Sequence, residues 1–478
     1  MRRIRKSRLF FFLACIVLAV VIYTFVRQQV VTVEGASDLD VVEELYTLIE
    51  EQSVYDLDSG TIVEGALRGM ASAIKDPYSS YYSKEEAAIH KASLAGEKVG
   101  IGVEIAEKNG KFIVVSPVKS SPAEKAGIRP YDEIVQINDV RLDGKTIGEV
   151  IKLMQGKAGE EVTLVLYRPS IERHIKVAVE RAKMENDTVD AKVITVENVP
   201  VGYVTISLFA ENTLEQWLQE VSKLIEQDVQ ALIVDVRDNP GGYLHSVAGI
   251  ISTIGEEGKV FAYMQDGKGK LEPLKTVKLD EIEGLKKEIR ELPIVILQNE
   301  GSASASEVFS AAMQSWGKGT LVGTKSFGKG TVQETWDLAN GGSVKLSTNK
   351  WLTPKETWIN GKGIKPDIEA DQHPLYMIEF IPVRGSFEVG DFAEEVAYAQ
   401  KVLHAFGFQI VRQDGYFDET TREAVVAFRE KYDLHDGDKL DELFFEKMQE
   451  QVALYKSKTE NDLQLQMAVS YVMHKLGH

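Results

Sequence analysis

The feature that most constrains the fold is an alternation of apolar strands and helices from residue 187 to about residue 370. Ala231–Val236 and Ile294–Leu297 are continuous apolar runs, which are typical of strands buried on both faces. The helical stretches Leu244–Ile254 and Ser304–Trp316 follow them. This order predicts an α/β sheet covered by helices. Side chains at the strand-to-helix junctions then lie at the carboxyl end of the sheet, where the sites of such folds form.

The rest of the chain predicts further regions, and 478 residues are enough for about three or four domains. Apolar residues recur at helical spacing in residues 38–95. Residues 96–183 contain short alternating strands and two short helical stretches, which predicts a compact β-rich module. Residues from 390 onward are helical again. The expected fold class is therefore a multidomain α/β chain with helical amino- and carboxyl-terminal regions.

The amino terminus carries a targeting signal. Residues 1–8 are basic and precede an apolar run from Leu9 to Val26, which is just long enough to span a bilayer core. The positive-inside rule places the basic segment in the cytosol and the rest of the chain outside the cell membrane. We predict a single-pass anchor at residues 9–26, and a cleaved signal peptide is the alternative.

Composition disfavours several classes of function. The net charge of −18 is unfavourable for gripping the phosphate backbone, so nucleic acid is not expected as a partner. Cys15 is the single cysteine, which excludes an intrachain disulfide and a cysteine-rich metal site. Neither a His-x-x-x-His pair nor a carboxylate cluster of ligand spacing occurs, so we predict no metal and no organic cofactor.

The segment Asn299–Glu307 lies between a buried strand and an apolar-faced helix. A hydroxyl at Ser304 would lie at the helix amino terminus, where free N–H groups and the helix dipole favour developing negative charge. The small neighbours Ala303 and Ala305 leave room for a substrate backbone. The same residues also fit a capping box, with Ser304 as the cap and Glu307 three residues later.

The segment Thr324–Gln333 supplies a candidate base. A serine needs a base to remove its proton, and a lysine can serve only when it is neutral, a state that burial favours. Lys329 lies between Gly328 and Gly330, so other chain segments can approach it closely. In an extended stretch, Gln333 shares a face with Lys329 and could orient its amine. An ordinary surface-loop lysine is the alternative.

The segment Asp235–Gly242 leads from a buried strand into a helix. Paired glycines at Gly241 and Gly242 let backbone N–H groups face a bound atom, as an oxyanion hole requires. A tight strand-to-helix turn explains the same glycines. His245 follows the pair, and it keeps a Ser-His-Asp arrangement open as an alternative to the lysine.

These three segments, in this order, resemble the carboxyl-terminal processing (tail-specific) proteases, subfamily A of peptidase family S41. Gly301–Glu307 is similar to the nucleophile motif of that family, and Phe327–Gln333 is similar to its base motif. Further family stretches match at Trp351–Pro354, Gly363–Asp367 and Asp76–Ser79.

The resemblance implies a serine endopeptidase that needs no cofactor. It makes Ser304 the nucleophile, Lys329 the base and Gln333 the residue that orients the lysine. The oxyanion hole is then formed by the N–H of Ala305 and that of a glycine, Gly242 rather than Gly241. The implied reaction processes proteins from or near their carboxyl termini, so protein or peptide substrates with accessible carboxyl ends are the expected partners. A non-catalytic scaffold that binds PDZ ligands or the cell wall at the membrane is the alternative.

The resemblance also implies the domain organisation. It places a crotonase/Clp-protease-like core at residues 186–375, after the helical region 38–95 and a PDZ domain at 96–183. Residues 390–453 resemble a helical peptidoglycan-binding domain, and residues 454–478 form a final helix. Peptidoglycan and a second copy of the chain are both open as partners of this region, and a purely structural cap is the alternative.

The PDZ resemblance names a second set of residues. Val99, Gly100, Ile101 and Gly102 match the carboxylate-binding loop, and the strand from Val103 would pair with an extended peptide. In this family the domain delivers or gates substrate. Arg168, at the far edge of the domain, could relay occupancy to the active site, and a solvated arginine is the alternative.

Overall fold

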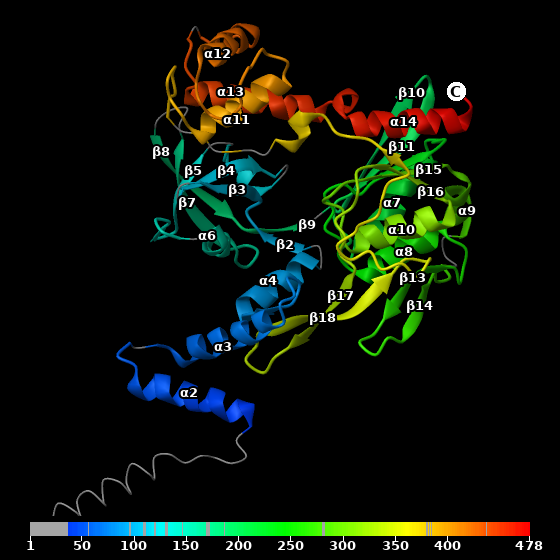
Figure 1. Ribbon diagram of the computed structural model, residues 1–478, viewed down its shortest axis with the longest axis horizontal. Helices are drawn as coiled ribbons and strands as arrows, with labels where there is room; N and C mark the ends of the chain where they lie inside the picture. Colours follow the sequence, from blue (N-terminus) through cyan, green and yellow to red (C-terminus); the bar gives the residue numbers. More distant parts are fainter. Residues whose placement is uncertain are drawn as a thin grey trace, which may run out of the picture. The chain divides into compact units, whose positions relative to one another are not determined.

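The computed structural model describes residues 37–478 except 56, 95–96, 109–110, 119–120, 130–131, 146, 169–172, 186, 280–282, 379–380, 382, 384 and 436 (Figure 1). The basic segment 1–8 and the predicted anchor 9–26 lie outside these residues. Within the described residues, none of the helices combines the length and the hydropathy that crossing a bilayer requires. The chain divides into two compact units, residues 1–83 and 84–478.

The first unit contains the helices α2 (Asp38–Gln52) and α3 (Ser59–Ala73) and the short strand β1 (Ser80–Tyr82). Asp58 caps α3 by accepting a hydrogen bond from the Thr61 N–H. The second unit begins with the helix α4 (Lys84–Leu94), which also lies in the predicted helical region 38–95.

The centre of the second unit is a six-stranded sheet in the order β10-β11-β12-β15-β16-β19. β10 (Val189–Val196) and β11 (Val199–Ile206) form an antiparallel hairpin. From β11 onward the neighbours are parallel, and these are β12 (Leu232–Asp235), β15 (Ile294–Gln298), β16 (Gly319–Gly323) and β19 (Ile368–Glu369). The α/β core expected from the sequence is therefore confirmed.

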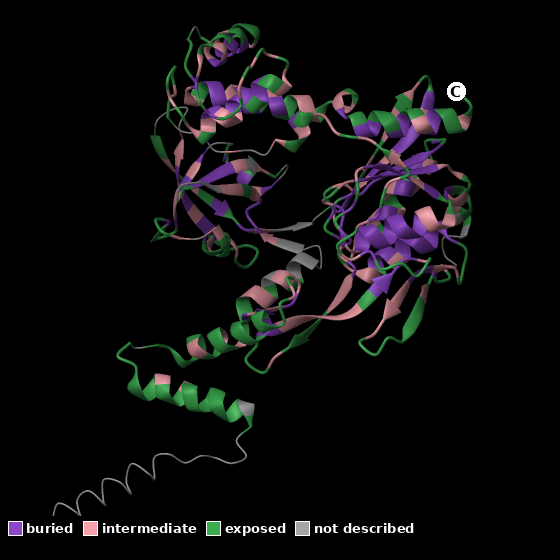
Figure 2. Cartoon of the chain, in the orientation of Figure 1, coloured by how far each residue is buried: buried purple, intermediate pink, exposed green. Residues whose placement is uncertain are grey.

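Both faces of this sheet are covered, which explains why its strands are continuously apolar. On one face, Leu232 and Val234 pack into the cluster formed with α7 (Thr213–Ile225), α8 (Leu244–Ile254) and α10 (Ala305–Trp316). On the other face, Ala231 and Ile233 pack against Leu465, Val469 and Val472 of α14 (Leu463–Leu476). Figure 2 shows the buried residues concentrated in these strands and in α8 and α10.

A second, antiparallel sheet is formed by strands that lie between those of the central sheet in the sequence. It contains β13 (Val260–Gln265), β14 (Leu271–Lys275), β17 (Thr331–Asp337) and β18 (Ser343–Leu352). The helix α9 (Glu283–Glu291) follows β14. β17 and β18 form a hairpin in which Gln333 lies opposite Ser347 and Thr335 lies opposite Lys345.

The predicted β-rich module is a five-strand path, β3 (Val103–Lys108), β4 (Lys111–Pro117), β5 (Glu133–Ile137), β7 (Glu161–Arg168) and β8 (Arg173–Glu180), with β6 (Val140–Arg141) paired to β5. Its two helices are α5 (Pro122–Lys125) and α6 (Ile147–Met154), close to the two predicted stretches. A separate ladder joins β2 (Glu97–Gly100) to β9 (Ala182–Glu185). The module has its own apolar core, which includes Phe112, Ile134 and Leu164.

The carboxyl-terminal region is helical, as predicted. The 3-10 turn η3 (Pro374–Met377) precedes α11 (Glu394–Ala405), α12 (Glu419–Lys431) and α13 (Glu442–Ser457), which share a core built around Phe417, Phe428 and Phe444. A short turn, η4 (Thr459–Asn461), then leads to α14. Because α14 covers the central sheet, the last helix belongs to the packing of the α/β core and not to that of α11–α13.

Candidate active site at the carboxyl edge of the sheet

Ser304 lies between β15 and α10, where the sequence predicts a nucleophile. Its backbone has φ 55° and ψ −113°, outside the conformations that non-glycine residues ordinarily adopt. The loop before it is tied to the turn after β12, because the Ser302 hydroxyl donates to the Val236 carbonyl at 2.7 Å and the Ala303 N–H donates to the Asn239 carbonyl at 3.0 Å. Strained backbone held by surrounding bonds is a frequent property of functional residues.

Glu307 connects the nucleophile segment to the base segment. Its carboxylate is fully buried, and Oε2 accepts hydrogen bonds from the Ser304 N–H at 2.9 Å and from the Lys329 N–H at 2.8 Å. Oε1 accepts from the Gly328 N–H at 2.7 Å and from the Ser326 hydroxyl at 2.6 Å. One oxygen atom therefore holds the backbones of the candidate nucleophile and the candidate base next to each other.

The two glycines after β12 differ in what their N–H groups do. The Gly241 N–H donates to the Asn239 side chain at 2.8 Å. Among the residues that the structure describes, the Gly242 N–H and the Ala305 N–H have no hydrogen-bond acceptor. Gly242 has φ 136°, and a Cβ there would lie 2.3 Å from the Phe209 carbonyl oxygen. A Cβ on Gly241 would lie 2.9 Å from the Ala305 nitrogen, so the glycine turn is in close contact with the start of α10.

Lys329 and Gln333 lie at the start of the β17–β18 hairpin. The Trp351 indole N–H donates to the Lys329 carbonyl at 2.8 Å, and the Trp358 indole N–H donates to the Gly330 carbonyl at 2.8 Å, so two indoles fix the loop. The Gln333 amide nitrogen donates to the hydroxyls of Thr331 and Ser347, at 2.9 and 3.1 Å. Both amide hydrogens are then used, and the oxygen is the atom that remains to accept a hydrogen bond.

All six residues of the predicted catalytic set line one cavity of about 680 Å³, and they are Ser304, Ala305, Lys329, Gln333, Gly241 and Gly242. Apolar side chains line the same cavity, among them Leu208, Leu244 and Val332. In the arrangement that the structure records, the Ser304 hydroxyl makes no hydrogen bond to Lys329, and Gln333 makes none to Lys329. Catalytic hydrogen bonds commonly form only once substrate is bound.

Helix α4 contributes Ala87, His90 and Lys91 to the cavity lining. Burial lowers the pKa of His90, and the positive charge of Lys345 lowers it further. His90 is therefore neutral at pH 7, and it adds no positive charge to the cavity.

His245, the alternative partner for the serine, also lines the cavity. Its side chain is 59% exposed, stacks on Tyr243 and lies 3.6 Å from the Glu211 carboxylate. It makes no hydrogen bond to Ser304 in the described part of the chain. No group of three or more His, Cys, Asp or Glu residues that could hold a metal ion occurs in that part either.

The predicted PDZ residues lie apart from the residues that line the cavity. The Gly102 carbonyl accepts from the Val118 N–H at 2.9 Å and from the Ser121 hydroxyl at 3.0 Å, which fixes the loop after β2. Val99, Gly100, Ile101 and Val103 lie in or beside this loop, and all of these residues are outside the cavity lining.

Arg168 is held within the PDZ domain. Its guanidinium makes a bidentate contact with Asp132, at 2.7 Å from both Nε and Nη2, and Nη2 also donates to the Gly127 carbonyl. The side chains of Arg168 and Asp132 are 12% and 1% exposed. The alternative of a solvated arginine is therefore wrong, because the pair occupies a nearly closed position.

Comparison with known proteins identifies the family. Residues 200–370 match the family model for peptidase family S41, and residues 113–168 match a PDZ domain. The sequence is 35% identical over 431 residues to the carboxy-terminal processing protease CtpB of Bacillus subtilis (strain 168), a match that covers 90% of this chain and 88% of that protein. The chain belongs to peptidase family S41. The prediction of a serine protease of the C-terminal processing type is confirmed at this level.

Further sequence comparisons agree with the S41 assignment. The sequence is 34% identical over 416 residues to a CtpA-like serine protease of Staphylococcus aureus (strain N315), covering 87% of this chain and 82% of that protein. Residues 23–86 match the N-terminal domain of the activating protease CtpB, and residues 393–448 match a peptidoglycan-binding domain. Among solved structures, the photosystem II D1 C-terminal processing protease has a TM-score of 0.44 at 25% identity, covering 70% of this chain and 87% of that one.

The sequence did not indicate two parts of this S41 site. Glu307 was visible only as the last residue of a capping box, whereas its carboxylate also binds the base segment. The buried Arg237 in the glycine turn carried no signal of a partner, and that partner comes from residues 462–464. A charged residue in the middle of a turn between buried elements is the one hint of such a partner that the sequence contains.

Proposed function

We propose that the cavity hydrolyses peptide bonds, with Ser304 as nucleophile and Lys329 as general base. The observation that carries this proposal is the Glu307 carboxylate, one oxygen of which binds the backbone N–H groups of both residues. The proposal requires a neutral amine at Lys329, and Gln333 orients that amine through its amide oxygen. It also assigns the oxyanion hole to the Gly242 and Ala305 N–H groups, since the Gly241 N–H is already bonded.

The steps conserve protons. The amine of Lys329 takes the Ser304 hydroxyl proton while Oγ attacks the peptide carbonyl, and the carbonyl oxygen becomes an anion between two N–H donors. The intermediate collapses by breaking the C–N bond, and the protonated lysine gives its proton to the leaving amine. Water then attacks the acyl-enzyme with the lysine again as base, which releases the new carboxyl end and restores Ser304.

The test measures cleavage of an unstructured protein by the full-length chain. Ser304→Ala and Lys329→Ala should each abolish cleavage, because one removes the attacking oxygen and the other removes the base. Ser315→Ala and Lys325→Ala are matched controls, since Ser315 lies at the other end of α10 and Lys325 is an exposed residue of the base loop. Cleavage that survives in Lys329→Ala would refute the dyad, and His245→Ala would then be the next variant. Absence of cleavage by the wild-type chain would favour the non-catalytic scaffold.

The proposal extends to gating by the PDZ domain. α4, which lines the catalytic cavity, is followed directly by β2, which leads into the loop Val99–Gly102. A protein tail bound at this loop can therefore act on the cavity through a short covalent connection. A peptide with a free carboxyl end should change the rate of cleavage of a second substrate, whereas the same peptide with an amidated end should not. Equal effects of both peptides would refute capture of the carboxylate.

The proposal also includes membrane anchoring through residues 9–26, an extracytoplasmic protease and the domain limits 38–95, 96–183, 186–375, 390–453 and 454–478. The apolar run in the sequence supports the anchor. In cells, the chain should stay with the membrane pellet after alkaline extraction and should be digested by protease added outside the membrane. Release into the alkaline supernatant would refute the anchor.

Peptidoglycan as a ligand of residues 390–453 is tested by co-sedimentation with purified cell walls, and a second copy of the chain is tested by sedimentation velocity.

A further inference from the structure

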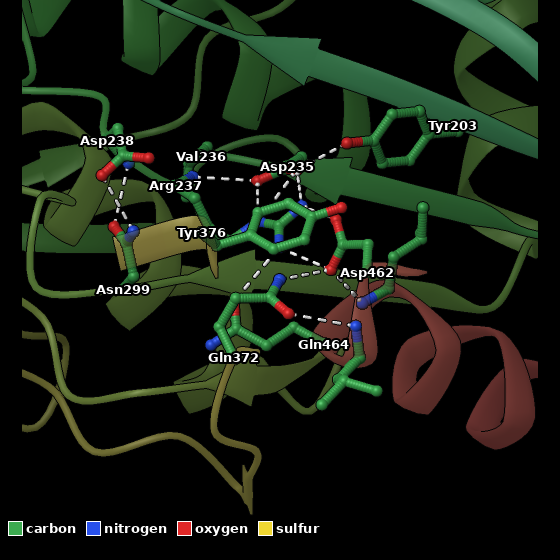
Figure 3. A network of polar contacts seen from close by, with 12 residues as sticks. Tyr203, Asp235, Val236, Arg237, Asp238, Asn299, Gln372, Tyr376, Asp462 and Gln464 are labelled. Carbon is green, nitrogen blue, oxygen red and sulfur yellow. Dashed lines mark hydrogen bonds and ion pairs between the residues drawn. The ribbon is translucent and has the colours of Figure 1, made fainter. Parts of the chain in front are cut away.

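A buried cluster of charged and polar groups joins the carboxyl end of β12 to the start of α14 (Figure 3). Arg237 lies at its centre, with a side chain only 13% exposed. Nε donates to both Asp235 carboxylate oxygens at 3.0 Å, and Nη2 donates to one of them at 2.6 Å. Nη1 donates to Asp462 at 2.9 Å and to Gln464 at 3.1 Å, and Nη2 donates to Asp462 at 2.7 Å. All the N–H positions of the guanidinium therefore have acceptors.

The cluster places two carboxylates, those of Asp235 and Asp462, around one guanidinium. The Tyr203 hydroxyl donates to Asp235 at 2.6 Å, and burial together with the neighbouring charge of Asp235 raises the pKa of Tyr203, so it remains a donor. Asp462 is the N-cap of α14 and accepts from the Leu465 N–H at 2.9 Å and from Gln372 at 2.7 Å. Burial opposes its ionisation, but the hydrogen bond and the charge of Arg237 outweigh burial and lower the pKa of Asp462. Hydrogen bonds therefore fix the positions of Tyr203, Asp235 and Asp462 around Arg237.

Arg237 also belongs to the turn 237–242, which carries the candidate oxyanion donor Gly242. Three side chains of this turn attach it to neighbouring segments, and Arg237 is the first. Asp238, at φ 56°, exchanges two hydrogen bonds with Asn299, each of 2.9 Å. Asn239 donates to the Ile206 carbonyl and accepts from the Gly241 N–H. Two attachments therefore lie within the α/β core, and the third is supplied by the carboxyl-terminal helix.

We infer that Asp462, assisted by Gln464, positions the oxyanion turn through Arg237, so that α14 is a structural part of the catalytic site. The inference rests on the proposed role of the Gly242 N–H. It makes Asp462 a positioning residue, since neither Asp462 nor Gln464 lines the cavity. The two carboxylate oxygens of Asp462 accept two parallel hydrogen bonds from Nη1 and Nη2 of Arg237. This bidentate contact fixes the orientation of the turn as well as its position.

The first experiment compares two N-cap aspartates of the same kind. Asp462→Asn retains a side-chain cap for α14, because asparagine caps helices as well as aspartate does, but it removes the charged fork. Asp441→Asn is the matched control. Asp441 caps α13 by accepting from the Phe444 N–H and pairs with the buried Arg429 at 2.6 Å, and it has no contact with the turn after β12 among the hydrogen bonds and ion pairs of the described residues. We expect kcat to fall about 10-fold or more in Asp462→Asn with KM nearly unchanged, and to stay at the wild-type value in Asp441→Asn.

The second readout separates positioning from general loss of stability. A peptide aldehyde forms a tetrahedral adduct with the serine and places an oxyanion in the hole, whereas the same peptide ending in an amide reports only ordinary binding. Asp462→Asn should weaken inhibition by the aldehyde by about the same factor as kcat and leave binding of the amide unchanged. An aldehyde that binds wild-type and Ser304→Ala proteins equally would show that the proposed function has failed, and not the positioning role.

A double-mutant cycle tests the route through Arg237. Arg237→Lys retains the positive charge but loses the fork, so Asp462→Asn should have little further effect on kcat in that background. If Asp462→Asn fails to fold, Gln464→Met provides a milder loss of one Arg237 acceptor and should give a smaller decrease in kcat. Wild-type kcat in a folded Asp462→Asn protein, an equal decrease in Asp441→Asn, or fully additive effects in the cycle would each overturn the inference.

Discussion

Replacement of Glu307 by glutamine tests the contact on which the candidate site depends. The side chain keeps its shape and one carbonyl oxygen, but an NH₂ group replaces the other oxygen and the negative charge is lost. In the wild-type protein, Oε2 binds the Ser304 and Lys329 amides, and Oε1 binds the Gly328 amide and the Ser326 hydroxyl. The effect depends on which oxygen the NH₂ group replaces.

The two orientations of the amide have different costs. An NH₂ group at the Oε2 position would face two backbone N–H donors and leave both without an acceptor. An NH₂ group at the Oε1 position would leave only the Gly328 N–H without an acceptor, because the Ser326 hydroxyl can rotate and accept a hydrogen bond from the NH₂ group. Ser326 Oγ already accepts from the Ile364 N–H at 2.7 Å, and a hydroxyl oxygen can accept two hydrogen bonds. We therefore expect the second orientation. One charge-assisted hydrogen bond is lost, which lowers the free energy of unfolding by about 2–3 kcal/mol.

The expected results follow from this orientation. A loss of about 2–3 kcal/mol lowers the Tm of a domain of this size by roughly 5–10 °C. The nucleophile and base amides keep an acceptor, but the loop that carries Lys329 is released at Gly328, so kcat should decrease by about 10- to 100-fold while KM changes little. Glu307→Ala is less informative, because all four donors would lose their partner in a fully buried position and the protein would be expected to unfold.

The assay measures calorimetric Tm and the kinetics of peptide cleavage side by side. Gln400→Leu is the control for stability alone, since Gln400 is fully buried and makes three hydrogen bonds, to Tyr416, Thr421 and Gly415, far from the cavity lining in sequence. It should lower Tm and leave kcat unchanged. A Glu307→Gln protein with wild-type Tm and kcat would refute the reasoning, and so would a Gln400→Leu protein with the same decrease in kcat.

Three further predictions concern other parts of the molecule. Gly242→Ala should reduce kcat by about 100-fold or more, because a Cβ at 2.3 Å from the Phe209 carbonyl oxygen displaces the candidate donor; steady-state kinetics of the folded variant checks this. Arg168→Met should lower the unfolding free energy of the PDZ domain by about 3–5 kcal/mol in chemical denaturation, because it leaves Asp132 charged and buried, and a change below 1 kcal/mol would contradict a closed pair. The pKa of Asp462 is lowered in the folded protein, so its contribution to stability is complete above the ordinary Asp pKa of about 4 and is lost as the pH falls through the lower folded value. The Tm of the wild type should therefore fall more steeply below about pH 4 than the Tm of Asp462→Asn. Parallel curves of Tm against pH would contradict the pairing of Asp462 with Arg237.

Much of the site was predictable because its parts lie at the ends of recognisable strands. The apolar runs at 231–236 and 294–297 identified buried parallel strands, and their carboxyl ends placed the glycine turn and Ser304 on one edge. Chemistry made the hydroxyl, the amine and the paired glycines candidates, and the resemblance to the carboxyl-terminal processing proteases selected them. What the spacing could not decide was the choice between Gly241 and Gly242. That choice depends on the Asn239 side chain, whose oxygen occupies the N–H of the first glycine.

Long-range partners were not predictable for a physical reason. The spacing from Ser304 to Glu307 predicts a local capping contact, and the Ser304 N–H does bind that carboxylate. Nothing local indicates that the same group binds residues 326–329, since a buried carboxylate accepts from whichever donors the fold brings to it. The amphipathic pattern of residues 463–476 likewise predicts a helix with one apolar face, but it does not say which surface that face covers. It covers the strands of the α/β core, which a sequence position after α11–α13 does not suggest.

The two faces of the central sheet hold the candidate site by different physical means. On the face covered by α8 and α10 the packing is apolar. This packing holds the strands against the helices, but it does not orient a turn, because apolar contacts are not directional. The turn after β12 needs an orientation, since an N–H group stabilises an oxyanion only when it points at it. Hydrogen bonds supply that direction, and they come from Asn299, from the Ile206 carbonyl and, through Arg237, from Asp462. The apolar side of α14 secures the helix to the sheet, while its N-cap residue Asp462 orients the turn. Loss of α14 should therefore impair catalysis and stability together, whereas loss of the charge at Asp462 should impair catalysis with α14 still in place.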